Sequence, residues 1–234
     1  MYDTLGNTSA LYNFIYSKTG TEMERYLTFL LGGIWVSVQA AAGALILATL
    51  LGLVLALMLL SRYTLIFYIA RTWVEIIRGT PALAQLFILY FGLADFGLRM
   101  PPLVAAIAGL GINGSAYLSE IFRSGIQAVD HGQTEAARSL GLSPFWLNYD
   151  VVLPQAGRIM VPPFVNYGVQ LLKDTSLIAS IAAPEIMFRA RNLVMETYDS
   201  MTIYLLVAAL YLCISIPLSQ LASFLQTRSR KASQ

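Results

Sequence analysis

Residues 26–60 read YLTFLLGGIWVSVQAAAGALILATLLGLVLALMLL, a stretch without Lys, Arg, Asp or Glu. A bilayer core about 30 Å thick is crossed by roughly 20 apolar helical residues, so this stretch is longer than one crossing requires. We therefore expect a transmembrane helix here, with its first residues lying along the membrane interface. Arg62 marks the end of this crossing.

The composition of the whole chain supports a membrane protein. Of the 234 residues, 57% are hydrophobic and 12% are charged, which is about half the charge density of a soluble domain. The single cysteine, Cys213, leaves no intrachain disulfide or paired-cysteine metal site. The formal net charge is +2 and the basic residues are dispersed, so we expect neither a metal nor nucleic acid as a ligand.

Further apolar runs predict more crossings, about five in all, and hence an all-α membrane protein. We expect the later crossings at residues 81–93, 103–121, 159–181 and 201–225. Residues 63–80 differ, because Arg71, Glu75 and Arg78 stand among aromatic residues there. At helical spacing this predicts an amphipathic helix approaching the membrane along its surface. Residues 1–234 form one domain, since no repeat or linker divides them.

Most basic residues that lie between and after these crossings fall on one side of the membrane. They are Arg62, Arg71, Arg78, Arg123, Arg138, Arg158, Arg228, Arg230 and Lys231. By the positive-inside rule this side is cytoplasmic, which makes residues 1–25 an extracytoplasmic or interfacial segment and residues 227–234 a cytoplasmic tail. Residues 1–24 have no basic n-region and no compact apolar core, so we do not expect a cleaved signal peptide there.

A polar segment between the third and fourth crossings has the pattern of a short helix. Residues 132–143 read GQTEAARSLGLS. Thr134 or a neighbour can cap the helix, Glu135 suits its positive first turn, and Gly141 suits a left-handed stop. We expect a short cytoplasmic helix at this place.

The residues of this helix suggest what it contacts. Ala136 and Ala137 form a small face that another protein's surface can approach closely, while Leu140 and Leu142 offer apolar contact. On these features alone, an ordinary interfacial loop helix is an equal alternative.

The same segment resembles the signature of the permease subunits of ATP-binding-cassette (ABC) importers. That signature is Glu-Ala-Ala, three residues, Gly, nine residues, an aliphatic residue, one residue and Leu-Pro, and here it falls on residues 135–154 with Val151 as the aliphatic. The resemblance implies a coupling helix seated in a groove of a separate ATPase subunit. The residues that it assigns to this coupling are Gly132, Glu135, Ala136, Ala137, Arg138, Leu140, Gly141 and Pro154.

Other segments are similar to the polar amino acid permeases of the histidine, glutamine and arginine type. They are residues 78–81 (RGTP), 116–126 (AYLSEIFRSGI) and 171–177 (LLKDTSL). The resemblance implies a type I ABC importer fold, a bacterial inner-membrane location, an extracytoplasmic solute-binding protein and a second permease chain, identical or related. The chain has no Gly-x4-Gly-Lys-Ser/Thr sequence, so we expect ATP and Mg²⁺ on the partner ATPase and no enzymatic activity here.

Two charged residues interrupt the fourth crossing and indicate a substrate site. Lys173 and Asp174 are costly at membrane depth, and adjacent helix positions point about 100° apart. Asp174 can receive the ammonium of an amino acid while Lys173 or a helix N-terminus receives its carboxylate. Thr175 and Ser176 add hydroxyls. The alternative is that Lys173 and Asp174 neutralise each other or contact backbone and stabilise a broken helix.

Further polar residues near membrane depth are candidates for the same site, with a structural hydrogen bond as the alternative for each. They are Gln85, Tyr90, Ser115, Glu120, Tyr167 and Gln170. Glu120 also has the i,i+3 spacing to pair with Arg123. Many members of the family have Glu after the Asn that Asn166 matches, whereas Tyr167 follows here, which argues against a cationic side-chain pocket.

Two other classes of function remain as alternatives. An ion-coupled secondary transporter would use Lys173 and Asp174, but the chain has no inverted repeat and residues 135–154 would be unexplained. An intramembrane enzyme needs a nucleophile with a base, or a metal cluster, at membrane depth. The single histidine, His131, lies outside the spans, where a surface role is expected.

Overall fold

The computed structural model describes residues 20–231, without the side chains of residues 21 and 225–231. All regular structure in that range is helical, so the predicted all-α fold is confirmed. The helices are α2 (Gly20–Leu31), α3 (Ile34–Leu59), α4 (Thr64–Gly79), α5 (Ala82–Phe87), α6 (Leu93–Asp95), α7 (Pro102–Gln127), α8 (His131–Ser139), α9 (Pro144–Trp146), α10 (Leu153–Asp174), α11 (Ile186–Thr197) and α12 (Ser200–Lys231). Two π-helical turns, η1 (Ile88–Gly92) and η2 (Leu147–Val152), and a 3₁₀ helix, η3 (Thr175–Ile181), connect them.

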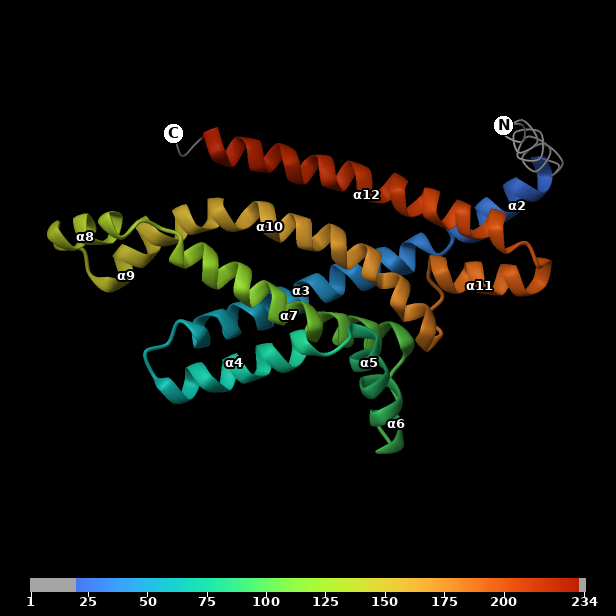
Figure 1. Ribbon diagram of the computed structural model, residues 1–234, viewed down its shortest axis with the longest axis horizontal. Coiled ribbons are helices and arrows are strands. Elements are labelled where there is room, and N and C mark those ends of the chain that lie inside the picture. Colours follow the sequence, from blue (N-terminus) through green and yellow to red (C-terminus); the bar gives the residue numbers. More distant parts are fainter. Residues whose placement is uncertain (1–19, 232–234) are drawn as a thin grey trace, which may run out of the picture.

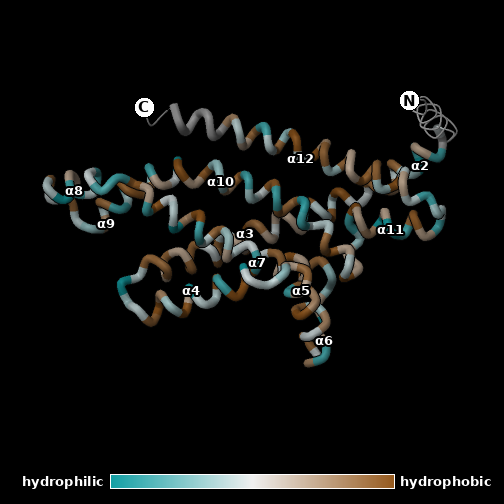
Figure 2. Tube along the Cα trace, viewed as in Figure 1, coloured by the Kyte–Doolittle hydropathy of each residue, from teal (hydrophilic) through white to brown (hydrophobic). Residues whose placement is uncertain are grey.

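The long helices lie side by side along one axis (Figure 1). The α3–α4 connection, α8, α9 and the end of α12 lie at one end of the molecule, and α2 and α11 lie at the other. Hydrophilic residues gather on α8 and α11, and mostly hydrophobic stretches run between these ends (Figure 2). The predicted cytoplasmic helix and the C-terminal segment therefore share one end of the bundle.

Three helical stretches in the described part of the chain are long and apolar enough to cross a bilayer. They are Glu22–Leu59, Pro102–Gln127 and Ser200–Phe224. The pair Thr64–Gly79 and Ala82–Asp95, bent by 102°, adds a fourth if it is one broken span. The predicted crossing at 159–181 is absent from this set, because Lys173, Asp174 and other polar residues lower its hydropathy. Such residues belong on surfaces that face other helices or water, away from lipid.

The centre of the bundle is the pair α3 and α7. Small residues recur at every fourth position on the buried face of α3, namely Ala40, Ala44, Ala48, Gly52 and Ala56. A Cβ on Gly52 would lie only 3.0 Å from Cβ of Leu118 on α7. Small side chains thus let the two backbones approach closely, as is common between helices in membranes.

Residues 63–80 do contain a helix, α4, but the prediction that it runs along the membrane surface is wrong. α4 packs lengthwise against α3 and α7 (Figure 1). Ala70, Val74 and Ile77 of α4 are buried in one cluster with Ala116 of α7. The face of α4 with these residues is buried by helix packing, so it does not need the membrane surface to cover it.

The course of α4 also changes the position of its last arginine. A helix rises about 1.5 Å per residue, so Arg78 lies about 21 Å along the bundle from Thr64. The charge distribution had placed Arg78 at the cytoplasmic end. It instead lies at the far end of α4 from the α3–α4 connection, beside the bend at Thr80 and Pro81, with its side chain exposed.

The fourth predicted crossing is two helices. α10 begins at Leu153, earlier than expected, and at Asp174 gives way to η3, which ends where Ala182 adopts a left-handed φ of 61°. Lys173 and Asp174 therefore stand at a junction between two helix types. At the C-terminus, α12 continues to Lys231 and includes most of the tail expected at 227–234.

Helix α11 was not predicted from the sequence, where its residues lie between two expected crossings. The carboxylate of Glu185 caps this helix by accepting a 2.7 Å hydrogen bond from the backbone N–H of Phe188. Glutamate is not among the preferred N-cap residues, so the usual signal for a helix start is absent.

Candidate functional site

An open cleft of about 480 Å³ lies where α4 bends into α5, beside α7 and α10. Its lining residues are Arg78, Gly79, Thr80, Pro81, Ala82, Asn113, Tyr117, Tyr167, Gln170, Asp174 and Leu177. This volume lies within the range of about 300–1,000 Å³ that is typical of small-molecule sites. Among these residues only Arg78 and Asp174 are charged.

Asp174 is partly buried and is held by a neighbouring amide. Gln170 Nε2 donates a 2.9 Å hydrogen bond to Asp174 Oδ1. Within the described residues, no basic group forms an ion pair with Asp174. The side chain of Lys173 is exposed and does not line the cleft. The two adjacent side chains thus form no ion pair, and Lys173 does not line the cleft with Asp174.

Arg78 is the other charged residue that lines the cleft. Its guanidinium carbon lies 5.6 Å from the centroid of the Tyr117 ring, a distance typical of cation–π contact. Tyr117 stacks on Tyr167, with the ring centroids 5.9 Å apart and the planes 20° apart. Arg78 has no ion pair in residues 20–231. One arginine and one aspartate, both without a charged partner, therefore share a cleft with an aromatic wall.

Of the lining residues, only Tyr167, Gln170 and Asp174 were sequence candidates, and Arg78, Asn113 and Tyr117 are among those that were not. Arg78 carried a usable signal, since it opens the RGTP segment that supports the family resemblance. Asn113 and Tyr117 lie one helical turn apart on α7, and only packing against α10 and the α4 bend reveals that they face this cleft.

Gln85 holds the α4–α5 bend and does not line the cleft. Its Nε2 donates to the carbonyl oxygen of Ile77 at 2.7 Å, and to the carbonyl and hydroxyl oxygens of Thr80 at 3.2 and 2.6 Å. Its Oε1 accepts a 3.2 Å hydrogen bond from Asn113 Nδ2. Gln85 thus makes structural hydrogen bonds, which was the alternative to a substrate-binding role for this residue.

The hydroxyl candidates also fall outside the cleft. Ser115 is buried and donates to the carbonyl oxygen of Ile112 at 2.7 Å, and Thr175 is buried and donates to that of Leu172 at 2.7 Å. Such bonds to the preceding turn satisfy a hydroxyl inside a helix bundle. Ser176 is partly buried but is not a lining residue. Tyr90 packs against a hydrophobic cluster instead.

Glu120 is confirmed as the partner of Arg123. Arg123 donates to Glu120 Oε2 from Nε at 2.9 Å and from a terminal nitrogen at 2.6 Å. Arg71 of α4 approaches the other carboxylate oxygen at 3.6 Å and pairs with Glu75 at 2.5 Å. Glu120 of α7 thus has a partner on its own helix, Arg123, and a more distant one on α4, Arg71.

The predicted cytoplasmic helix is α8, and its ends follow local signals. Asp130 caps it by accepting a 2.6 Å hydrogen bond from the backbone N–H of Gly132, so Thr134 is not the cap. Gly141 has a φ of 80°, as expected for a left-handed stop. The helix begins at His131, one residue earlier than predicted, and ends at Ser139.

Comparison with known proteins places these features in one family. Residues 48–231 match the model of the family described as "Binding-protein-dependent transport system inner membrane component", a range that contains both the cleft and α8. The chain belongs to this family. The family's inner-membrane location agrees with the apolar helices of the bundle.

Relatives and solved structures in this family resemble the chain over most of its length. A probable amino-acid ABC transporter permease, y4tG of Sinorhizobium fredii, is 36% identical over 90% of this chain and 93% of its own. The probable glutamine ABC transporter permease GlnP of Bacillus subtilis is 37% identical over 89% of this chain and 97% of its own. A chain in the crystal structure of an amino acid ABC transporter with histidines has a TM-score of 0.85 and 34% identity, covering 90% of this chain and 99% of that one. A MetNI methionine transporter chain shares the fold, with a TM-score of 0.72 at 18% identity.

In this family member, α8 presents a different face from the one expected. Ala137 is 4% exposed and packs within its own loop against Leu147, Val152 and Ala156. Leu142 packs against the same cluster, so Ala137 and Leu142 hold the helix and do not offer a contact surface. Ala136 and Leu140, four residues apart, are exposed, Leu140 by 82%. The outward face is thus formed by Ala136 and Leu140.

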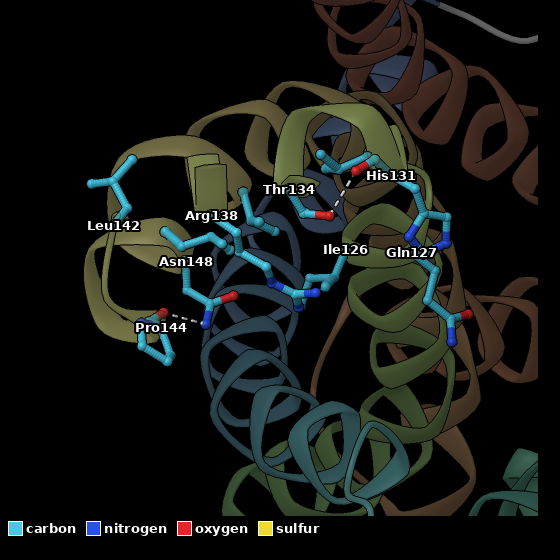
Figure 3. Close-up of a pocket in the computed structure, with 11 residues that line it drawn as sticks. Ile126, Gln127, His131, Thr134, Arg138, Leu142, Pro144 and Asn148 are labelled. Carbon is cyan, nitrogen blue, oxygen red and sulfur yellow. Dashed lines mark hydrogen bonds between the residues drawn. The ribbon is translucent and has the colours of Figure 1, made fainter. Parts of the chain in front are cut away.

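A second hollow, of about 520 Å³, lies under α8 (Figure 3). Thr134 and Arg138 of α8 line it together with Ile126 and Gln127 at the end of α7. Asn148 closes another side and donates a 2.8 Å hydrogen bond to the carbonyl oxygen of Pro144. α8 therefore stands off α7 and rests chiefly on η2.

Proposed function

We propose that this chain is the permease subunit of an ABC importer that carries a polar amino acid, and that the cleft between α4 and α10 binds that amino acid in passage. The observation that carries the proposal is the presence of Arg78 and Asp174 on one cleft, each without a charged partner in the described residues. An uncompensated charge at membrane depth usually marks a substrate pathway.

The two charges match the two ends of a zwitterion. Asp174 receives the ammonium group, and Gln170 holds the carboxylate of Asp174 in place from one turn away. Arg78 receives the carboxylate, for which a guanidinium supplies two parallel N–H donors. Stacking on Tyr117 holds the guanidinium at the rim of the cleft. Arg78 thus takes the role that the sequence analysis gave to Lys173.

Energy enters from a separate ATPase, which binds ATP and Mg²⁺, because this chain has no P-loop sequence. The exposed face of α8, with Ala136 and Leu140, contacts that ATPase. A solute-binding protein delivers the amino acid at the opposite end, beside α2 and α11. A second permease chain, identical or related, covers the exposed side of the cleft. Amino-acid ABC permeases among the relatives support this assignment.

The test is uptake by the assembled transporter in proteoliposomes that contain ATP. Asp174→Asn and Arg78→Gln are expected to lower uptake at least about tenfold, while the ATPase still co-purifies with the permease. Lys173→Gln serves as the matched control and retains uptake, because Lys173 lies outside the cleft. Normal uptake by either cleft variant refutes this site. Uptake that continues without ATP and stops when an ionophore is added supports the ion-coupled alternative.

A further inference from the structure

We infer that the cleft selects an amino acid whose side chain is polar but uncharged, such as a carboxamide. This inference rests on the proposed function, since it assumes that the cleft binds the substrate. It concerns the part of the cleft that remains once Arg78 and Asp174 hold the two backbone groups of the amino acid.

The first argument is the number of charges. Arg78 and Asp174 are the only charged lining residues, and one zwitterionic backbone uses both. A cationic side chain would need a second carboxylate, and an anionic side chain a second cation. Moving an unpaired charge from water into a protein site is unfavourable, and neutral dipoles offset only part of that cost.

The nearest other charged residues do not supply that second partner. Lys173 is adjacent in sequence, but its exposed side chain does not line the cleft. Glu120, two turns beyond Asn113 on α7, is already bound by Arg123 and approached by Arg71. A charged substrate side chain therefore has no counter-ion within reach in the described part of the chain.

The second argument is the hydrogen-bonding capacity that the cleft leaves open. Asn113 uses its Nδ2 toward Gln85 and Gln170 uses its Nε2 toward Asp174, while the amide oxygens of Asn113 and Gln170 accept no hydrogen bond within residues 20–231. Tyr117 and Tyr167 make contacts through their rings, and their hydroxyls likewise form no hydrogen bond within residues 20–231. The open cleft thus offers two acceptors and two hydroxyl donors.

A carboxamide side chain both donates and accepts, which matches this set. A site built to hydrogen-bond a substrate group discriminates strongly against an analogue that lacks the group, because its polar atoms are then left unpaired. Apolar amino acids are therefore also disfavoured.

The test measures binding of radiolabelled glutamine, arginine and glutamate to the purified permease–ATPase complex without its binding protein. Omitting the binding protein removes its own selectivity from the result. Glutamine is expected to bind at least about tenfold more tightly than arginine or glutamate. Binding of arginine or glutamate as tight as that of glutamine overturns the inference, as does no binding of any of the three at about 10 mM.

Charge-changing variants then test the cause. Asn113→Asp adds a carboxylate, so arginine is expected to gain about tenfold relative to glutamine. Asn113→Ser also loses the bond to Gln85 but adds no charge, and Asn192→Asp on α11 adds a charge away from the cleft. Neither control is expected to change the preference. A shift in either control equal to that of Asn113→Asp overturns the electrostatic argument.

The same assay separates this inference from the proposed function. If Asp174→Asn and Arg78→Gln abolish binding but arginine competes equally with glutamine, the site stands and the inference about the side chain fails. If glutamine is preferred and neither substitution weakens its binding, the cleft is not the site and both fail.

Discussion

The hydroxyl of Tyr211 on α12 donates a 3.0 Å hydrogen bond to Oε2 of Glu185, a carboxylate with 0% exposure at the start of α11. The other oxygen of Glu185 caps α11 through Phe188. One buried side chain therefore ties α11 to α12 at the end of the bundle opposite α8.

Loss of this tie is expected to lower stability in two steps. Tyr211→Phe leaves a buried carboxylate oxygen with one hydrogen bond fewer and costs about 1–3 kcal/mol. Glu185→Ala removes the cap as well and costs more, by about 1 kcal/mol for the cap alone. Thermal unfolding of the purified complex measures both. Equal melting temperatures for Tyr211→Phe and the parent protein would show that the bond contributes nothing.

The Gly32–Gly33 break between α2 and α3 gives a second prediction. A Cβ on Gly33 would lie 2.5 Å from the backbone nitrogen of Ile186, a group that cannot rotate away. Gly33→Ala is therefore expected to destabilise the protein by about 1–3 kcal/mol, as overpacking does. Gly157→Ala in α10 is the matched control, since nothing lies within 4 Å of its added Cβ. This control is expected to be neutral or stabilising by about 0.5–1 kcal/mol.

The ion pairs of α4 and α7 should differ in importance, since Glu120–Arg123 lies within α7 and Arg71–Glu120 joins the two helices. The Arg71 side chain is 45% exposed, so Arg71→Ala is expected to cost only about 0–1 kcal/mol. Glu120 is 19% exposed and holds Arg123 through two hydrogen bonds. Glu120→Ala should therefore lower the melting temperature more than Arg71→Ala. The opposite order would show that Arg123 does not depend on Glu120.

Two substitutions in α8 should separate partner contact from internal packing. Leu140→Asp places a charge on the exposed face, so co-purification of the ATPase is expected to fall while the permease keeps its melting temperature. Ala137→Leu overfills a buried position, so it is expected to lower the melting temperature by an amount equivalent to about 1–3 kcal/mol. Normal ATPase assembly with Leu140→Asp would contradict the proposed coupling face.

Features with a local cause could be predicted from the sequence. The long apolar runs predicted α3, α7 and α12, because the bilayer requires a length of apolar helix that hydropathy reports directly. Gly141 predicted the end of α8, because few other residues adopt a positive φ. Asp174 was singled out because a charge inside an apolar stretch is costly enough to need a reason; it does line the cleft, and its role in binding a substrate stays a prediction.

Features that depend on residues far away in the sequence could not be predicted. Residues 63–80 looked amphipathic, but whether such a face meets lipid or another helix depends on Ala116, far along the chain. Ala136 and Ala137 are adjacent and identical residues, so the sequence does not tell which of them is buried; only Ala137 packs against Leu147 and Val152. Glu185 gave no sign of a helix start, because its burial depends on Tyr211 of α12.

The sequence by itself determined the membrane class, the helical architecture, the family and the position of the short helix α8, since these depend on hydropathy and on short motifs. Only the tertiary structure decided which basic residue lines the same cleft as Asp174. The sequence places Lys173 beside Asp174, but neighbouring helix positions point in different directions. The bend at Thr80 and Pro81 instead brings Arg78, almost a hundred residues earlier, to the same cleft. Arg78 and Asp174 share this cleft because α4 and α10 both pack around α7, and no local sequence pattern encodes that packing.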